Sequence, residues 1–457
     1  MKSPNLGPVT RISVIGCGYL GAVHAASMAE LGHEVVGIDT DAAKVALLSS
    51  GRAPFYEPGF DELLRRNVDS GRLTFSTEFA DAANAEVHFI GVGTPQRADG
   101  QGADLAYVES ATDALLDSLP NDATPPSIVA GKSTVPVGTA AHLAEKFAAK
   151  GAIVVWNPEF LREGFAVDDT LRPDRLVYGL PSDTDAAALA EAKLDEVYAQ
   201  ILSGATYADR DWTETPKVTT DYATAELVKV AANSFLATKI SFINAMAEIC
   251  DATGGNVTTL AEAIGYDDRI GKKFLRAGVG FGGGCLPKDI RAFQARVHEL
   301  DLPNTLDFLH DVDEVNLRQR SRTVAKLVDA LGGTVAGRTI AVLGAAFKPD
   351  SDDIRDSPAL DIARQIRDSG ATVRVTDPKA GPVVAKFAAD IPFVDTIEAT
   401  IEGADAIVVL TEWQQFRDLD PNQIAARTAG RVVIDGRNCL DRRAWEAAGF
   451  SYVGMGR

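Results

Sequence analysis

Residues 11–39 of the chain read RISVIGCGYLGAVHAASMAELGHEVVGID, and this stretch decides the fold of the first part of the protein. A β-branched run at 12–15 ends in glycines, a stretch with helical spacing follows, and a second apolar run ends in Asp39. This order of elements predicts a strand–helix–strand unit of a parallel sheet.

Three glycines directly follow the first run in the pattern GxGxxG, namely Gly16, Gly18 and Gly21. The first permits a tight turn, the second lets a pyrophosphate approach the backbone, and the third lets the helix pack on the strand. The phosphates would lie at the helix N-terminus, where free N–H groups favour negative charge. Asp39 would accept a hydrogen bond from a ribose 2′-hydroxyl and repel a 2′-phosphate, which predicts NAD rather than NADP. The alternative is a glycine-rich turn without a ligand.

Further strand-like runs follow at 86–92, 127–130, 153–156 and 175–179, with helical stretches between most of them. Six strands with crossovers predict a doubly wound parallel sheet of the Rossmann type. We place this N-terminal NAD-binding domain at residues 1–205.

A long helix is predicted after the sequence Thr-Thr-Asp at 219–221, which offers candidate caps, and before the glycine pair at 254–255. About 30 residues at ~1.5 Å rise make a helix of roughly 45 Å. Its apolar residues spread around the axis, which suits a central spine between domains or a subunit interface. We place a central helical domain at 206–330.

A second strand–glycine–helix–strand unit covers 338–378 and ends its second strand in Asp377, and further strand-like runs occur at 406–413 and 431–438. These predict a second Rossmann-like parallel sheet, in a C-terminal domain at 331–457. The turn GAAFK at 344–348 lacks the dinucleotide fingerprint. It could hold a nucleoside diphosphate, or the sheet could be a structural duplicate without a ligand.

The charge balance narrows the class of partner. There are 45 Lys and Arg against 64 Asp and Glu, a net charge of −19, which disfavours nucleic acid and acidic membrane surfaces. No segment reads as a secretory signal or a spanning helix. The four cysteines are widely separated, which fits a reducing compartment, and we expect a cytoplasmic protein.

One cysteine stands in a glycine-rich segment, GVGFGGGCLPKD at 278–289. A thiolate at Cys285 would be favoured by a helix N-terminus and by Lys288, although a small buried cysteine is an equal alternative. Lys229 and Asn233 lie four residues apart, on one face of the long helix. They are polar groups on an apolar helix and need partners, so they are either site residues or part of a plain salt bridge.

Nine motifs in order along residues 11–440 resemble the UDP-glucose 6-dehydrogenase family, within the UDP-glucose/GDP-mannose dehydrogenases. The resemblance implies an NAD domain, a central helical segment used for dimerisation and a C-terminal UDP-binding domain. The motifs are VIGCGYLG, APFYEPGF, FIGVGTP, GKSTVPVGT, NPEFLREG, AELVKVAANSFLATKISFINAMAEIC, DDRIGKKFLRAGVGFGGGCLPKD, GAAFKPDSDDIRDSPA and DGRN.

The resemblance implies a four-electron oxidation of UDP-glucose to UDP-glucuronate with two NAD⁺. The aldehyde formed first would be trapped by a cysteine thiolate as a thiohemiacetal, oxidised to a thioester and released by water. GDP-mannose and UDP-N-acetylmannosamine are the alternative substrates, and DDRIGKKFL at 267–275 resembles the UDP-glucose branch. A nucleotide-sensing protein without turnover is the alternative from another class, and the filled catalytic positions argue against it.

The resemblance also implies site residues. Cys285 would be the nucleophile, Lys229 would stabilise an oxyanion beside Asn233, Asp289 would place or deprotonate water, and Thr134 and Glu159 would hold water, with Glu159 a candidate base. The implied cofactor contacts are Gly16, Gly18, Tyr19, Leu20, Gly21, Asp39, Lys44, Val92, Thr94, Ser133, Thr134, Glu163 and Arg355. The implied substrate contacts are Glu159, Phe160, Leu161, Arg162, Lys229, Asn233, Arg269, Phe274, Leu275, Arg276, Gly282, Phe347, Lys348 and Arg437.

Within this set, Phe274 is a candidate to stack on uracil, and Lys348 and Arg437 carry charge suited to the diphosphate or the sugar. No metal is expected. The sequence departs from many relatives at Gly284, where they have serine, and at Leu286, where phenylalanine is frequent. Neither change removes a catalytic group. We expect a homodimer, or a larger homo-oligomer, built on the long helix.

Overall fold

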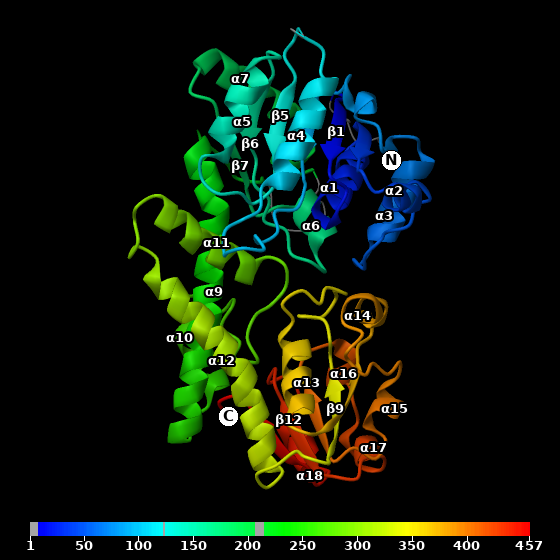
Figure 1. Ribbon diagram of the computed structural model, residues 1–457, viewed down its shortest axis with the longest axis vertical. Coiled ribbons are helices and arrows are strands. Elements are labelled where there is room, and N and C mark those ends of the chain that lie inside the picture. Colours follow the sequence, from blue (N-terminus) through cyan, green and yellow to red (C-terminus); the bar gives the residue numbers. More distant parts are fainter. Residues whose placement is uncertain (1–7, 122–123, 206–213) are drawn as a thin grey trace. The chain divides into compact units, whose positions relative to one another are not determined.

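The computed structural model describes residues 8–121, 124–205 and 214–457. The chain divides into two compact units, Met1–Ala232 and Asn233–Arg457, and each is described by itself (Figure 1). The border between them falls inside the long helix α9 (Tyr222–Thr253). The predicted domain borders near 205 and 330 stay predictions.

The first unit is built on one sheet of eight strands, in the order β3-β2-β1-β4-β5-β6-β7-β8. The register pairs Ile15 of β1 with Ile38 of β2 on one side and with Ile90 of β4 on the other. The strands are β1 (Arg11–Ile15), β2 (Glu34–Ile38), β3 (Leu73–Ser76), β4 (Val87–Ile90), β5 (Ile128–Gly131), β6 (Ile153–Trp156), β7 (Leu176–Leu180) and β8 (Lys217–Asp221).

The predicted doubly wound α/β class is confirmed, because helices cover both faces of this sheet. Ile12 and Val14 of β1 belong to the core under α1 and α7, whereas Ile15 belongs to the core under α4 and α5. The remaining helices of the unit are short. The helices before α9 are α1 (Tyr19–Glu30), α2 (Ala42–Ser49), α3 (Phe60–Asp69), η1 (Phe79–Ala82), α4 (Ala106–Ser118), α5 (Thr139–Ala148), α6 (Ala166–Leu171), α7 (Thr184–Val197) and α8 (Ala199–Leu202).

The direction of one strand was predicted wrongly. Strand β7 pairs with β6 antiparallel through Trp156 and Gly179, and β8 then runs parallel to β7. The segment between β6 and β7 contains only the six-residue helix α6, rather than the long crossover helix that usually joins parallel strands. Strands β3 and β8, which the sequence analysis missed, are the two edges of the sheet.

The long helix is confirmed at 32 residues. Asp221 caps it, since its carboxylate accepts the backbone N–H of Thr224 at 2.8 Å and the Thr224 hydroxyl at 2.9 Å. Within the described parts of the chain, no helix combines the length and the hydropathy needed to cross a membrane.

The second unit holds a fully parallel sheet in the order β10-β9-β11-β12-β13, as predicted except for the edge strand β13. Its strands are β9 (Thr339–Leu343), β10 (Thr372–Thr376), β11 (Ala406–Val409), β12 (Val432–Asp435) and β13 (Ser451–Gly454). Its helices after α9 are α10 (Val257–Gly265), α11 (Leu286–Glu299), α12 (Asp307–Ala330), α13 (Pro358–Asp368), α14 (Gly381–Phe387), α15 (Ile397–Ile401), α16 (Gln414–Arg417), α17 (Pro421–Ala425) and α18 (Arg442–Ala447).

Candidate active site

The glycine turn after β1 forms an open cradle at the start of α1. Gly16 has φ +88° and donates its N–H to the carbonyl of Ile38 at 2.8 Å. A Cβ atom on Gly21 would lie 1.8 Å from the carbonyl oxygen of Gly16, so only glycine lets the helix pack this closely on the turn. A Cβ on Gly18 would meet nothing within 4 Å. The space next to Gly18, at the N-terminal end of α1, is therefore open. A pyrophosphate could reach the free N–H groups of the first helical turn there.

Asp39 lies beside this cradle, at the end of β2, and is 8 % exposed. It accepts the backbone N–H of Cys17 at 2.9 Å and that of Asp41 at 3.0 Å. The ammonium group of Lys44 is 2.7 Å from the same carboxylate. The carboxylate is thus fixed in place beside Lys44, in a position suited to accept a hydrogen bond from a ribose hydroxyl. That Asp39 and Lys44 contact the cofactor stays a prediction.

Residues at the carboxyl ends of β4 and β5 complete the cofactor side. The Ser133 hydroxyl donates to the carbonyl of Val92 at 2.7 Å, and the Thr94 hydroxyl donates to the carbonyl of Thr134 at 2.8 Å. These four predicted residues therefore lie together, because neighbouring parallel strands end at one edge of the sheet.

Glu159 and Lys229 form an ion pair of 3.0 Å in which both side chains are largely buried. Glu159 also accepts the N–H of Leu161 at 2.7 Å, two residues further on. The Phe160 ring lies under two cations, with the Arg175 guanidinium 3.7 Å and the Lys229 ammonium 5.6 Å from its centroid. The structure thus realises the salt-bridge alternative for Lys229 and pairs it with a predicted catalytic residue. The sequence analysis did not identify Arg175.

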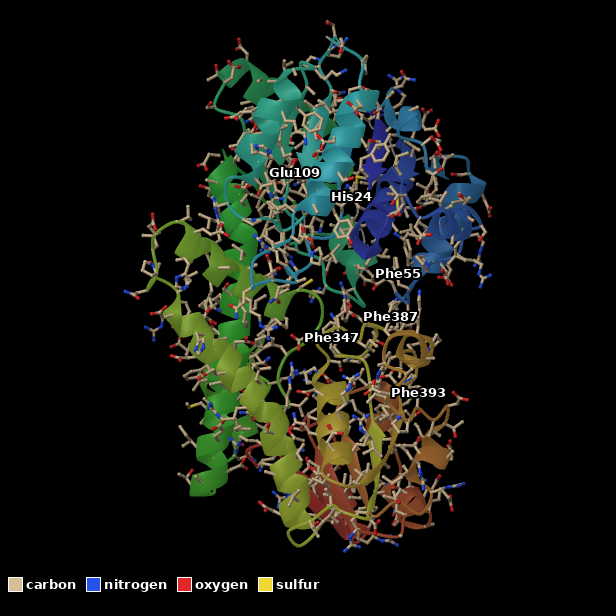
Figure 2. All side chains as sticks on the ribbon, viewed as in Figure 1. His24, Phe55, Glu109, Phe347, Phe387 and Phe393 are labelled. Carbon is tan, nitrogen blue, oxygen red and sulfur yellow. The ribbon has the colours of Figure 1, made fainter. Side chains whose placement is uncertain are left out.

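Glu57 is a second residue that the sequence analysis missed, although it lies in the quoted motif APFYEPGF. Its carboxylate is 6 % exposed and accepts the Tyr19 hydroxyl and the N–H groups of Gly164 and Ala166, at 2.6 and 2.8 Å. Burial raises the pKa of Glu57, and the same hydrogen bonds oppose that shift. Glu57 therefore ties the loop before α6 to the first turn of α1. The Tyr19 ring packs on Phe55, which Figure 2 labels, with centroids 4.7 Å apart.

Two predicted charged residues of this loop have different surroundings. The Arg162 guanidinium makes a forked contact with Asp169, at 2.9 and 2.6 Å, and lies 5.0 Å from the Phe165 ring centroid. Glu163 lies close enough to Tyr19 for its charge to raise the pKa of the Tyr19 hydroxyl, together with burial. Glu163 thus lies near the first turn of α1, and its contact with the cofactor stays a prediction.

In the second unit, Cys285 is exposed and is the N-cap residue of α11. Asp289, one turn later, donates its N–H to the carbonyl of Cys285 at 2.9 Å, so the two predicted residues share a helix face. The Asp289 carboxylate is 2 % exposed and accepts the Asn233 amide at 2.7 Å and the Lys288 ammonium at 2.6 Å. The charge of Lys288, predicted to favour a Cys285 thiolate, is therefore engaged by Asp289.

The glycines before Cys285 leave no room for side chains. A Cβ at Gly282 would lie 2.3 Å from the carbonyl oxygen of Asp356, and one at Gly283 would lie 2.8 Å from the Phe347 ring. A Cβ at Gly284 would lie 2.3 Å from the guanidinium carbon of Arg355. Because residue 284 is glycine rather than serine, the Arg355 guanidinium can lie against the cysteine loop at this position.

Two buried asparagines hold this loop, and the sequence analysis missed both. The side-chain oxygen of Asn244 on α9 accepts the N–H of Gly278 at 2.8 Å, and that of Asn316 on α12 accepts the N–H of Phe281 at 2.7 Å. Both residues are fully buried. An asparagine inside a long predicted helix was the available signal, because an amide that becomes buried there needs a partner.

The predicted UDP residues of the second unit cluster around the same loop. The Arg437 guanidinium donates to the carbonyls of Leu410, Gly280 and Phe347, at 2.8, 3.1 and 3.0 Å. It therefore joins the cysteine loop to the sheet, a role that the prediction of a phosphate contact did not include. The Lys348 ammonium is 5.3 Å from the Phe347 ring centroid.

The segment at 269–276 holds the other predicted substrate residues, and they differ in exposure. Phe274 has φ +63° and is 37 % exposed, whereas Leu275 is buried and Arg276 is exposed. Arg269 is 89 % exposed and pairs with Asp267 at 2.7 Å. A positive φ at a residue with a large side chain is strained and is typical of ligand sites.

The other cysteines are poor nucleophiles. Burial raises the pKa values of the Cys17 and Cys439 thiols, and the nearby carboxylates Asp39 and Asp435 add to this, so both thiols stay protonated. Cys250 is buried in the core between α9 and α10. These three positions agree with the structural interpretation of the sequence.

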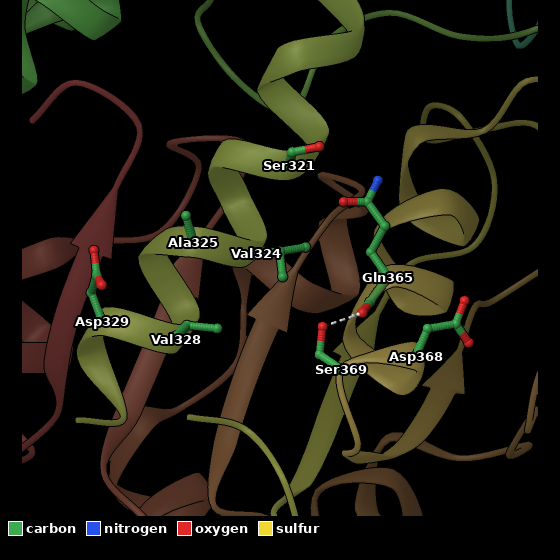
Figure 3. Close-up of a pocket in the computed structure, with 8 residues that line it drawn as sticks. All are labelled: Ser321, Val324, Ala325, Val328, Asp329, Gln365, Asp368 and Ser369. Carbon is green, nitrogen blue, oxygen red and sulfur yellow. Dashed lines mark hydrogen bonds between the residues drawn. The ribbon is translucent and has the colours of Figure 1, made fainter. Parts of the chain in front are cut away.

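One groove on the described part of the surface lacks the predicted chemistry. Figure 3 shows a groove between α12 and α13 in the second unit, and no predicted site residue lines it. Its lining residues are Ser321, Val324, Ala325, Val328, Asp329, Gln365, Asp368 and Ser369.

The first prediction concerns Asp39. NAD⁺ should bind more tightly than NADP⁺, because a 2′-phosphate would meet this carboxylate. In Asp39→Ala the ratio of the two Kd values should fall by about tenfold or more, since like charges in contact cost several kcal/mol and Lys44 is set free. Titration calorimetry with both cofactors measures the ratio, and Asp69→Ala, at an exposed carboxylate, is the control. Equal Kd values in the unaltered protein would contradict the assignment.

The second prediction concerns Glu57. Glu57→Ala leaves the buried N–H of Ala166 without its acceptor and leaves that of Gly164 only the Tyr19 hydroxyl at 3.1 Å, so the free energy of unfolding should fall by about 1–3 kcal/mol. Urea unfolding measures the change, and Glu62→Ala, on the exposed side of α3, should leave it within about 0.5 kcal/mol. Equal stability of the Glu57 and Glu62 variants would show that the loop does not depend on this carboxylate.

Comparisons with known proteins agree with this geometry. Three models of the UDP-glucose/GDP-mannose dehydrogenase family match the chain: the NAD binding domain over residues 10–202, the central domain over 223–318 and the UDP binding domain over 341–442. The UDP-glucose 6-dehydrogenase of Rhizobium meliloti is 39 % identical over 98 % of this chain and 99 % of its own.

Two solved structures are similar over nearly their whole length. A UDP-glucose dehydrogenase from Pyrobaculum islandicum has a TM-score of 0.86 and 36 % identity, covering 100 % of both chains. A UDP-D-ManNAc dehydrogenase from Pyrococcus horikoshii has a TM-score of 0.82 and 28 % identity, covering 98 % of this chain and 99 % of its own. A cofactor cradle followed by an exposed cysteine on a glycine loop, matched by all three domain models and by full-length relatives, places the chain in one family: it belongs to the UDP-glucose/GDP-mannose dehydrogenases.

Proposed function

We propose that this chain is an NAD-dependent enzyme that oxidises UDP-glucose to UDP-glucuronate. The observation that carries the proposal is Cys285, an exposed thiol at the N-cap of α11, with the buried pair Asn233–Asp289 one turn further on. A nucleotide-sensing protein would not need this arrangement. The NAD cradle of the first unit and the family membership supply the rest of the argument.

Bound NAD⁺ accepts a hydride from C6 of the sugar in each of two oxidations. In the first, the alcohol loses a hydride and a proton and becomes an aldehyde. Glu159 and Thr134 are suited to hold the water that takes this proton, because both follow strand ends on the cofactor side of the first unit. Lys229, paired with Glu159 at 3.0 Å, supplies the positive charge that stabilises an alkoxide.

The second oxidation needs a tetrahedral carbon that carries a hydride. The Cys285 thiolate adds to the aldehyde carbon, and the oxygen takes up a proton to give a thiohemiacetal. Loss of a hydride and of that proton converts it to a thioester, which stays attached to the protein. The Asn233 amide donates to Asp289, one turn after Cys285 on α11, and we propose its second N–H as a donor to the oxygen of the tetrahedral species.

Hydrolysis ends the cycle. Water attacks the thioester carbon, the C–S bond breaks, and the products are the carboxylate and the free thiol. Glu159 is the candidate base for this water, and Asp289 is the candidate group that places it. Burial of Asp289 between an amide and an ammonium group keeps its oxygen atoms fixed for this purpose.

The choice of sugar is supported by the comparisons. The full-length relative at 39 % identity carries the name of a UDP-glucose enzyme, whereas the structure named for UDP-D-ManNAc is 28 % identical. The decisive assay mixes the purified protein with NAD⁺ and UDP-glucose, GDP-mannose or UDP-N-acetylmannosamine, and follows NADH by absorbance. Two NADH per UDP-glucose are expected. Binding of the nucleotides without NADH would overturn the enzyme assignment in favour of a sensor.

The third prediction concerns the covalent step. Cys285→Ser should fold and bind both ligands, and its turnover should fall by roughly a thousandfold or more, as expected for loss of a nucleophile. A serine alkoxide forms poorly at neutral pH, and an ester hydrolyses more slowly than a thioester, so a sugar adduct on the new serine should be visible by intact-mass spectrometry. The controls Cys250→Ser and Cys439→Ser should stay active. Near-parental turnover of Cys285→Ser would exclude the covalent route.

We propose further that the chain forms a homodimer through α9. Phe235, Phe242 and Ile249 are spaced by seven residues and are 68, 49 and 53 % exposed. Such a spacing places them along one face of the helix, and a stripe of exposed large apolar side chains is typical of a helix–helix interface. A second copy of the same helix is the occupant that fits a self-complementary apolar stripe.

The fourth prediction tests this interface. The double variant Phe235→Glu/Phe242→Glu places charges in the stripe, so the mass measured by light scattering at micromolar concentration should fall to that of a monomer. Tyr107→Glu alters an aromatic residue of α4 that is 60 % exposed and should leave the mass unchanged. A monomeric parent protein would refute the dimer.

A cytoplasmic site of action completes the proposal. All four cysteines are free, and the mechanism requires Cys285 as a thiolate rather than in a disulfide. A reducing compartment keeps such a thiol available.

A further inference from the structure

The first unit buries a lysine for which the reaction above has no use. Lys132 directly follows β5, in the motif GKSTVPVGT, and is 6 % exposed. Its side chain lies between two aromatic rings, with the ammonium nitrogen 5.4 Å from the Phe89 centroid and 5.8 Å from the Tyr198 centroid. Removing an ammonium group from water is energetically costly, so a residue buried in this way needs a reason.

The contacts of the ammonium group are all uncharged. It donates to the side-chain oxygen of Asn157 at 2.9 Å, to the backbone carbonyl of Asn157 at 3.3 Å and to the Tyr198 hydroxyl at 3.3 Å. Methionine would fill the same space without the desolvation cost. The ammonium group of Lys132 therefore serves to position neighbouring groups rather than to stabilise the fold.

Asn157 is the first residue after β6 and is fully buried. Its N–H donates to the carbonyl of Gly131 at 2.8 Å, its side-chain nitrogen donates to the carbonyl of Val177 at 3.0 Å, and the Tyr198 hydroxyl donates to its side-chain oxygen at 2.7 Å. Lys132 adds the contact to the backbone carbonyl. This peptide leads directly into Pro158 and Glu159, so its orientation sets the direction of the turn.

We propose that Lys132 is a positioning residue for this reaction: its ammonium group holds the turn at 157–159, and with it the Glu159 carboxylate, against the ends of β5 and β6. The same lysine precedes Ser133 and Thr134, so one buried amino group anchors the two segments that carry the predicted cofactor contacts and the candidate base. This inference rests on the proposed function for its kinetic consequence alone.

The electrostatic surroundings support the proposal. Burial lowers the pKa of Lys132 to about 7, and Glu159 acts in the opposite direction. The titratable groups around it are His24 on α1, labelled in Figure 2, Tyr198 after α7 and Glu159 after β6. Burial and the charge of Lys132 both lower the pKa of His24, so that imidazole stays neutral, and burial keeps Tyr198 protonated by raising its pKa.

The pH dependence of protein stability shows whether burying the charged form of Lys132 destabilises the fold. The unfolded chain binds the lysine proton up to a pKa near 10.5, whereas the folded protein releases it near 7, so the cost is fully present below pH 7 and disappears as pH rises toward about 10.5. In Lys132→Met the melting temperature should therefore equal or exceed that of the parent at pH 6.5. The advantage should shrink between pH 7 and pH 10.

The fifth prediction separates positioning from packing. In Lys132→Met the backbone amides of 157–163 should exchange hydrogen about tenfold faster or more, because the turn has lost its anchor. The kcat with UDP-glucose should fall by about tenfold or more while KM for UDP-glucose changes less than about threefold, since Glu159 is displaced whereas the UDP contacts predicted for the second unit are unaffected. The sugar thioester on Cys285 should accumulate, as detected by intact-mass spectrometry of the mixture.

Two further variants complete the test. Lys150→Met removes an ammonium contact at the surface of the first unit, to Asn121 at 2.8 Å, and should match the parent in all three measurements. Tyr198→Phe removes only the hydroxyl shared by Lys132 and Asn157, and should show a smaller change in the same direction. It carries the test if Lys132→Met does not fold.

The outcomes distinguish this inference from the proposed function. Unchanged exchange at 157–163 together with a kcat within twofold of the parent would make Lys132 a packing residue and overturn the inference. A parent protein that reduces no NAD⁺ with any nucleotide sugar would overturn the proposed function. In that case, amide exchange in Lys132→Met still decides whether the lysine holds the turn.

Discussion

The contact between Gly16 and Gly21 is the constraint on which the first unit depends. A single added carbon at Gly21 would lie 1.8 Å from the Gly16 carbonyl oxygen, so any side chain there would push α1 away from β1. With the helix in place, its first N–H groups open onto the space above Gly18. The register of β1 with β2 then delivers Asp39 to the same edge, and β4 and β5 end beside it.

The second sheet repeats the unit but closes the corresponding site. Gly344 donates its N–H to the carbonyl of Thr376 at 2.8 Å, as Gly16 does to Ile38 in the first sheet. Asp377, however, accepts the N–H groups of Ala345 and Ala346 and the indole N–H of Trp413. A carboxylate engaged in this way has little capacity left for a ribose diol. The two sheets thus share the same strand–glycine–helix–strand unit. They differ in the hydrogen bonds of the aspartate at its end, which leave Asp39 suited to a ribose diol and Asp377 not.

Buried polar groups fix the loops that carry the proposed chemistry. Glu57 holds the loop before α6, Lys132 holds the turn before Glu159, and Asn244 and Asn316 hold the cysteine loop. Each of these groups is costly to bury alone, and each makes at least one hydrogen bond to a backbone atom of a loop, although the buried Asn244 amide nitrogen has no hydrogen-bond partner among the described residues. The hydrogen bonds that offset this cost also fix the geometry of the loops, which a reaction with two hydride transfers and a tethered intermediate requires.

The sequence by itself determined both Rossmann-like sheets, the long helix, the cofactor cradle and the cysteine at a helix start, because glycine spacing and apolar runs act locally. It missed the edge strands β3, β8 and β13, since strands with one neighbour need no continuous apolar run. Only the tertiary structure reversed β7, paired Lys229 with Glu159, and revealed the anchors Glu57 and Lys132. These features depend on which residues, far apart in the sequence, pack together in the folded protein. The spacing of residues along the chain does not determine this.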